Sequence, residues 1–299
     1  AKQSVAQAIY CLAGSGDEVI IPSPFWVSYP EMVKLGGATP VIAHTGVKES
    51  YKLTPAILEA AITDRSRVLI LCSPSNPTGV VYTPRDLEEI AEVLRPHDQI
   101  TVISDEIYEH IVYDVPFVSF GTLDGMKERT VTVNGFSKGF AMTGWRLGYM
   151  AGEKQIIKAA SKLQSQLTSA PSSISQRAGV AALEMDMDSI RKMVDEFRRR
   201  RDKLVEWAQS DPRISCPVPD GAFYLFPDIG AYLGTTTRGG RPIETSTDLC
   251  MYLLEDHNVA LVPGDAFGSP TGIRISYAAA YDDIVEASRR ISAGLSQLS

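Results

Sequence analysis

The stretch RVLILCSPSNPTG at residues 67–79 decides the fold class, because it joins an apolar β-strand to a turn rich in Pro, Ser and Asn. Four more apolar strands are predicted at residues 18–23, 39–44, 100–104 and 130–134, and segments with helical spacing separate them. Continuous apolar strands that alternate with helices are typical of a parallel sheet covered on both faces. The sequence therefore predicts an α/β fold with a mostly parallel sheet.

The pattern changes after the last of these strands, where long helical segments follow one another. Apolar residues recur at a helical spacing over residues 187–210, which predicts a long linking helix. Beyond it, shorter strands are predicted at RISCPV, AFYLFPD, VALVPG and GIRISYA, and the polar, Gly-rich residues 234–244 are predicted to form a surface loop. We expect a large domain over residues 1–185 and a smaller α+β domain over residues 186–299.

Composition excludes several classes of protein. The 29 Lys and Arg residues against 36 Asp and Glu give a net charge of −7, which argues against nucleic acid as a partner. No uninterrupted apolar run is long enough for a transmembrane helix. The four cysteines lie far apart without a CxxC pair, so we expect neither a metal site nor a disulfide framework. Since the chain begins Ala-Lys-Gln without Met, we expect the natural N-terminus and any transit segment to precede it.

Three of the predicted strands end in unusual polar residues, within SPSNPTG, DEIYEHIVY and GFSKGFAMTGWRLGY. In an open α/β sheet, ligands bind beyond the carboxyl ends of the strands. We therefore expect one site to collect Asn76, Asp105, Tyr108, Ser137, Lys138 and Arg146.

Lys138 is the most informative of these residues, because it follows a buried strand and has apolar neighbours. Removal from water disfavours an ammonium and lowers its pKa, as a Schiff-base lysine requires. The alternative is a surface lysine whose stem passes aromatic neighbours. Ser137 and Arg146 favour the first interpretation, since a hydroxyl, a guanidinium and a nearby helix N-terminus suit a phosphate monoester.

The other polar residues each have two interpretations. Asp105 either caps the next helix or pairs with a protonated pyridine nitrogen. Tyr108 is either a half-buried tyrosine or a ligand of the same ring's phenolic oxygen, and Asn76 is either a turn residue or a second ligand of that oxygen. Trp26 either packs in the core or stacks on a flat ring. Arg274, in an apolar strand, needs a carboxylate partner from the protein or from a substrate.

Together, SPSNPTG, DEIYEHIVY, NGFSKGFAMTGWRLGY and RISYA resemble the class I aminotransferases, which have fold type I and use pyridoxal 5'-phosphate. The resemblance covers nearly the whole chain. GDEVIIPSPFWVSYPEM and VPGDAFG are similar to subgroup Ib, and SKLQSQLTSAPSSISQRAGVAAL looks most like its plastid branch in plants and algae, which acts on aspartate and prephenate.

The resemblance implies a role for each cofactor residue. Lys138 would attach the cofactor and shuttle protons, Asp105 would partner the pyridine nitrogen, and Asn76 and Tyr108 would hold the 3′ oxygen. A separate set would bind the phosphate: Ser137, Arg146 and the backbone at Ala1 and Lys2.

The resemblance also implies substrate contacts. Trp26 would stack on the ring, Arg274 would bind the α-carboxylate, and Trp26 and Asn76 would also contact the substrate. Lys2 is a candidate contact for a second carboxylate or for the ring of prephenate. One departure is Gly139, where the family usually has Ala; we expect it to loosen the turn after Lys138.

The activity implied by the resemblance is amino transfer from aspartate to 2-oxoglutarate, together with amination of prephenate to arogenate. The alternative is an aromatic or kynurenine aminotransferase, or another enzyme of the same fold type. The resemblance further implies amino acids and 2-oxo acids as ligands, a homodimer and a plastid location, or a cytoplasmic one without a transit segment. It places part of the small domain in an N-terminal region that precedes this chain.

Overall fold

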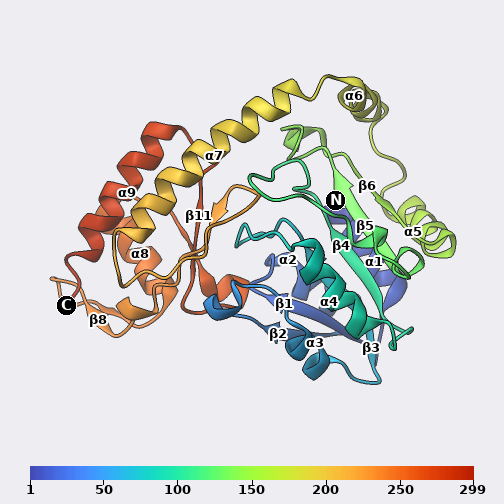
Figure 1. The fold of residues 1–299 in the computed structure, drawn as a ribbon, viewed down its shortest axis with the longest axis horizontal. Helices are drawn as coiled ribbons and strands as arrows, with labels where there is room; N and C mark the ends of the chain where they lie inside the picture. The colour runs from blue at the N-terminus through green and yellow to red at the C-terminus, as the bar shows by residue number, and fades with distance from the viewer.

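The computed structural model describes residues 1–299, and the larger part of it is built around a six-stranded sheet. Its spatial order is β2-β1-β3-β4-β5-β6, and β1 to β5 run parallel while β6 runs antiparallel to β5 (Figure 1). The strands are β1 (Glu18–Ser23), β2 (Thr39–His44), β3 (Ser66–Cys72), β4 (Thr101–Asp105), β5 (Thr130–Gly135) and β6 (Gly148–Ala151). The predicted α/β fold with a mostly parallel sheet is confirmed.

Both faces of this sheet are covered, which explains why the strands β1, β3 and β4 are buried along most of their length. Successive side chains of a strand point to opposite faces. In β1, Val19 and Ile21 belong to the core cluster under α1 and α2, whereas Ile20 belongs to the cluster under α3 and α4. The helices of this part are α1 (Lys2–Leu12), α2 (Ser28–Leu35), α3 (Pro55–Ala61), α4 (Pro84–Leu94), α5 (Lys154–Leu167) and α6 (Ser173–Glu184).

The long helix α7 (Asp188–Gln209) leads to a second, smaller assembly, which lies on the left in Figure 1. There, an antiparallel sheet of order β10-β11-β7 carries α8 and α9. Its elements are β7 (Tyr224–Leu225), α8 (Ser246–His257), β10 (Val262–Pro263), β11 (Ile273–Ser276) and α9 (Tyr281–Leu295). Short 3-10 helices are η1 (Val47–Glu49), η2 (Phe120–Thr122), η3 (Lys127–Arg129), η4 (Thr143–Trp145), η5 (Gly230–Tyr232) and η6 (Gly264–Phe267). The boundary at residue 185 stays a prediction.

Two local expectations in the smaller part were wrong. RISCPV is not a strand: Ser215 forms a single bridge to Asp228, and the prolines that follow lack the N–H groups that a ladder needs. Residues 234–244 are not simply a loop, since β8 (Thr235–Thr236) pairs with β9 (Pro242–Ile243). Ile243 is fully buried, so one apolar side chain anchors an otherwise polar hairpin.

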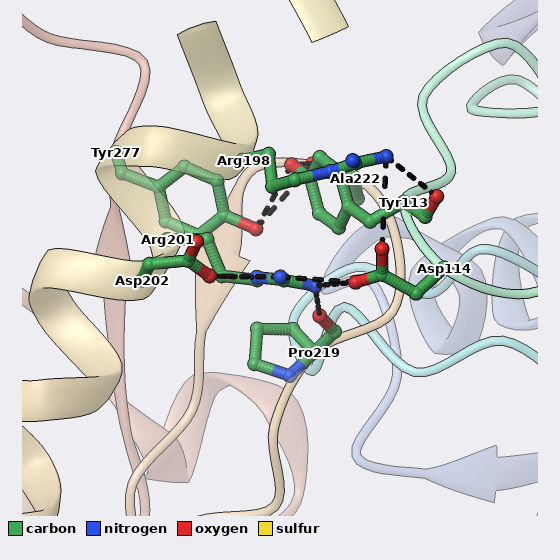
Figure 2. Close-up of polar contacts among 8 residues, drawn as sticks. All are labelled: Tyr113, Asp114, Arg198, Arg201, Asp202, Pro219, Ala222 and Tyr277. Atoms are coloured by element: carbon green, nitrogen blue, oxygen red, sulfur yellow. Dashed lines mark hydrogen bonds and ion pairs between the residues drawn. The ribbon is translucent and has the colours of Figure 1, made fainter. Parts of the chain in front are cut away.

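Arg201, on α7, joins the two parts of the chain (Figure 2). Arg201 is 6% exposed, and its guanidinium donates to the carboxylate of Asp114 at 3.1 Å and to the carbonyl of Pro219 at 3.3 Å. It also pairs with Asp202 at 2.7 Å. A buried guanidinium is tolerated only when it is paired and hydrogen-bonded, and these three partners satisfy it.

Tyr113 adds a second set of bonds to this junction (Figure 2). Its hydroxyl donates to the carbonyl of Ala222 and lies 3.2 Å from the hydroxyl of Tyr277, while its carbonyl accepts from Arg198 at 2.7 Å. The segment that follows β4 is therefore fixed both to α7 and to the residues that lead into β7.

Glu106 follows β4 and is a buried carboxyl group that the sequence analysis did not single out. It is 3% exposed, and its Oε1 accepts hydrogen bonds from the hydroxyls of Ser104 and Ser119 and from the N–H of Phe120. Burial raises the pKa of Glu106 to about 7, against the opposing effect of these hydrogen bonds.

This raised pKa predicts a pH-dependent stability. Between pH 4.5 and about 7 the folded protein binds a proton at Glu106 that the unfolded chain has released, so stability falls as pH rises through this window. The substitution Glu106→Gln removes this titration. The free energy of unfolding of the variant, relative to that of the wild type, should therefore increase by roughly 3 kcal/mol when the pH is raised from 5 to 8. Urea unfolding of both proteins at the two pH values measures this difference.

The matched control is Glu109→Gln, which changes a partly exposed carboxylate on the same segment. It should keep most of the wild-type pH dependence, because the charge of Glu109 makes only a minor contribution to the raised pKa of Glu106. Parallel stability–pH curves for Glu106→Gln and the wild type would show that Glu106 does not titrate in this range.

Candidate active site

All ten residues predicted to form the site line one cavity of about 570 Å³. They are Ala1, Lys2, Trp26, Asn76, Asp105, Tyr108, Ser137, Lys138, Arg146 and Arg274. The parallel sheet delivers most of them, because the carboxyl ends of β3, β4 and β5 lie side by side and each continues into one of the quoted motifs. The start of α1 adds Ala1 and Lys2, and β11 adds Arg274 from the smaller sheet.

Asp105 is a buried carboxylate without a cationic partner. It is 4% exposed, and its oxygens accept hydrogen bonds from the hydroxyl of Tyr29 at 2.7 Å and from the N–H of Ile107 at 3.3 Å. Burial raises its pKa, although the bond from Tyr29 opposes the rise. The hydrogen bond from the N–H of Ile107 fits the capping interpretation. The carboxylate of Asp105 nevertheless also lines the cavity. The sequence analysis missed Tyr29, which lies on α2. Its only indication in the sequence was its position three residues after Trp26.

Lys138 is half-buried in the same cavity, so the interpretation as a surface lysine was wrong. Its ammonium lies 5.5 Å from the ring centroid of Phe223 and 5.9 Å from that of Tyr108. Removal from water lowers the pKa of Lys138, and the positive charges of Arg274 and Arg146 lower it further. The amine is therefore more easily deprotonated than an ordinary lysine.

Gly139 makes room for a neighbouring side chain. A Cβ atom at this position would lie 2.7 Å from Cδ2 of His110, which is too close for any carbon contact. The imidazole of His110 packs edge-on against Phe140 at 5.2 Å. The ring thus occupies the space that a methyl group would take, and the expectation of a looser turn stays a prediction.

Arg274 has no carboxylate partner within the protein. Its Nη1 donates to Oδ1 of Asn76 at 2.9 Å, and its guanidinium lies over the rings of Tyr224 at 4.6 Å and Phe267 at 5.0 Å. Its Nε is buried and has no hydrogen-bond acceptor. Because an unsatisfied buried donor is costly, this guanidinium is poised to bind an anion that enters the cavity, and the interpretation with a protein carboxylate was wrong.

Tyr108 and Tyr224 share a buried hydrogen bond, with their hydroxyl oxygens 2.9 Å apart. Burial raises the pKa of both phenols, so both carry their protons near neutral pH. Sequence reasoning placed Tyr224 in a strand but not in the site, because a tyrosine in an alternating strand has no signal of its own. Gln7, also missed, lines the cavity with a buried amide nitrogen that has no acceptor.

The far end of the cavity is suited to a small anion. The guanidinium of Arg146 is exposed and donates to the carbonyl of Thr143 at 2.7 Å, and Ser137 lines the same wall. Helix α1 begins beside them without a side-chain cap, so its first N–H groups are available. The ammonium of Lys2, which also lines the cavity, lies 5.0 Å from the ring centroid of Trp26.

The cavity has a strongly positive lining. Its charged residues are four cations, Lys2, Lys138, Arg146 and Arg274, and a single acid, Asp105. None of the five takes part in an ion pair within the protein. Such a cavity attracts ligands with several negative charges and one positive charge. Elsewhere, no three His, Cys, Asp or Glu side chains gather as metal ligands, and no helix has the length and apolarity to cross a membrane.

Comparison with known proteins gives consistent matches. The family model "Aminotransferase class I and II" matches residues 1–288. A Petunia hybrida protein named bifunctional aspartate aminotransferase and glutamate/aspartate-prephenate aminotransferase is 53% identical over 299 residues, which is 99% of this chain. The chain spans 62% of the length of that protein.

Two solved structures are also similar. The aspartate aminotransferase from Rhizobium meliloti has a TM-score of 0.96 and 45% identity, with all of this chain and 75% of the other covered. The aromatic aminotransferase from Pyrococcus horikoshii OT3 has a TM-score of 0.92 and 40% identity, with 99% and 77% covered. Sequence, fold and site geometry agree, and the chain belongs to the class I and II aminotransferases.

Proposed function

We propose that this protein uses pyridoxal 5'-phosphate to transfer the amino group of aspartate to 2-oxoglutarate, which yields oxaloacetate and glutamate. We propose that it also aminates prephenate to arogenate, with glutamate or aspartate as donor. The observation that carries this proposal is the set of unpaired charges around the cavity. The name of the Petunia relative supports both substrates.

The charges in the cavity fit the proposed cofactor and substrates. A phosphate dianion suits Arg146, Ser137 and the start of α1, and the single acid, Asp105, suits a protonated ring nitrogen. Arg274 and Lys2 remain for the two carboxylates of aspartate, glutamate or prephenate. The fourth cation, Lys138, remains for attachment of the cofactor.

The residues divide the chemistry between them. When bound, pyridoxal 5'-phosphate supplies an electron-accepting ring that stabilises the charge left after the substrate loses its Cα proton. Lys138 accepts that proton at Nζ and returns it at the other end of the reacting system, and its lowered pKa keeps a neutral amine available. Asp105 holds a proton on the ring nitrogen, and Asn76 and Tyr108 orient the ring through its phenolic oxygen.

The half-reaction of the intact protein tests this function. Aspartate alone should yield one equivalent of oxaloacetate per bound cofactor and then stop until 2-oxoglutarate is added. Arogenate should give a similar burst of prephenate. Lys138→Ala should reduce the burst rate by about 10²- to 10⁴-fold or more, because it removes the proton-transferring amine. Borohydride should attach the cofactor to the peptide that contains residue 138 in the wild type only.

Other outcomes would point elsewhere. Continuous product formation without 2-oxoglutarate would indicate a lyase. A burst with tyrosine and none with arogenate would favour the alternative function of an aromatic aminotransferase, the activity in the name of the similar Pyrococcus horikoshii structure.

The two carboxylate-binding residues should differ in their effects. Arg274→Lys loses the two-pronged contact to a group that every substrate carries, so KM should rise by about 10- to 150-fold for aspartate, arogenate and tyrosine alike. Lys2→Gln should raise KM only for substrates with a second carboxylate. Steady-state kinetics of both variants check this pattern, which is refuted if Lys2→Gln leaves prephenate turnover intact.

We also propose that the protein is a homodimer and that α6 contributes to the interface. The residues of α6 that face the protein are small: Ser175, Gly179 and Ala182 are buried. Its other faces carry Ile174 and Leu183, which are 72% and 64% exposed. Water contact with these side chains is unfavourable, and a partner surface packed over α6 would cover them. The plastid location stays a prediction.

The double variant Ile174→Lys, Leu183→Lys should be a monomer, since two buried lysines without partners would oppose association. Light scattering of the intact protein after size-exclusion chromatography measures the mass. Leu35→Lys is the matched control, because Leu35 is a single leucine, 79% exposed, on α2. A dimeric double variant would exclude α6 from the interface.

A further inference from the structure

Tyr224 stands between the two halves of the site. Its side chain is 6% exposed and lines the cavity, and it belongs to β7 of the smaller sheet. Its hydroxyl is bonded to that of Tyr108, which follows β4 of the large sheet. Its ring lies under the guanidinium of Arg274, on the neighbouring strand β11. Tyr224 therefore contacts both of these residues.

The backbone around Tyr224 is fixed on several sides. The N–H of Gly221 donates to the carbonyl of Gly79 at 2.8 Å, and that of Ala222 donates to the carbonyl of Ile111 at 2.8 Å. The carbonyl of Ala222 also accepts from Tyr113, within the junction in Figure 2. The position of Tyr224 is therefore set by the same contacts that hold the segment carrying Tyr108.

The two contacts of Tyr224 have different chemistry. A hydroxyl that donates to a second hydroxyl polarises it and makes it a stronger donor in turn. An aromatic face under a guanidinium holds the cation in place by attraction to the ring. One side chain can thus affect the hydroxyl of Tyr108 through its oxygen and the orientation of Arg274 through its ring.

We propose that Tyr224 is a positioning residue that strengthens the hydrogen bond donated by Tyr108 to the cofactor's phenolic oxygen and orients Arg274 for the substrate carboxylate. This inference rests on the proposed function. It assigns the two effects to separable parts of one side chain, which makes it testable with two substitutions.

The first substitution, Tyr224→Phe, keeps the ring and removes the hydroxyl. A weaker donor at Tyr108 stabilises negative charge on the phenolic oxygen less, so deprotonation of the bound cofactor becomes harder. The midpoint of its visible absorbance against pH should rise by roughly 0.1–0.6 pH unit. The Kd of succinate, a dicarboxylate probe, should stay within about twofold of the wild type because the ring is retained.

The second substitution, Tyr224→Leu, removes the ring as well. It should shift the midpoint similarly and also weaken succinate binding by about 2- to 30-fold, the range of a cation–π contact. Tyr252→Phe, at a buried tyrosine of α8 whose hydroxyl bonds to Gly294, is the matched control and should change neither quantity.

A double variant tests whether Tyr224 acts through Tyr108. If it does, Tyr108→Phe with Tyr224→Phe should have the same midpoint as Tyr108→Phe alone. An unchanged midpoint in Tyr224→Phe, or an additional shift in the double variant, would overturn this inference while the wild type still binds cofactor. A wild type that never develops the cofactor's visible absorbance would instead overturn the proposed function, and this inference with it.

Discussion

The burial of Asp105 without a cationic partner is the constraint on which the site depends. A carboxylate removed from water is costly unless something compensates its charge. Here two neutral donors, Tyr29 and the N–H of Ile107, meet part of that cost and leave the charge itself unmatched. The four cations of the cavity form no ion pair with it. The cavity thus keeps its one acid, Asp105, for a positive group on a ligand and its cations for negative groups.

The topology of the large sheet explains how these charged side chains come together. Parallel strands bring their carboxyl ends to one edge of the sheet. Three motifs that follow one another at intervals of about thirty residues in the sequence therefore meet at this edge. The smaller sheet then covers the same edge and adds Arg274 from β11. Each part of the chain supplies only some of the charged side chains of the site, and these side chains come together in the cavity between the two parts.

Much of this arrangement could be predicted from the sequence, because its signals are local. The apolar runs at β1 and β2 gave their bounds directly, and the polar residues after β3, β4 and β5 indicated the site. Tyr29 and Tyr224 could not be predicted, since each acts through a partner more than seventy residues away. The β8–β9 hairpin was missed because a single buried Ile243 outweighs the polar composition around it. The steric role of Gly139 could not be predicted either, because the ring of His110 that fills its space comes from another segment.

The junction around Arg201 has a consequence for biosynthesis. Asp114, Arg201 and Tyr277 are far apart in the chain, yet all three belong to one set of contacts that fixes the segment after β4 (Figure 2). A ribosome adds roughly 5–20 residues per second. On the order of ten seconds or more therefore separates the emergence of Asp114 from that of Tyr277. During that interval the edge of the nascent large sheet that lines the cavity is uncovered, and the growing chain depends on protection from aggregation until Tyr277 has been made.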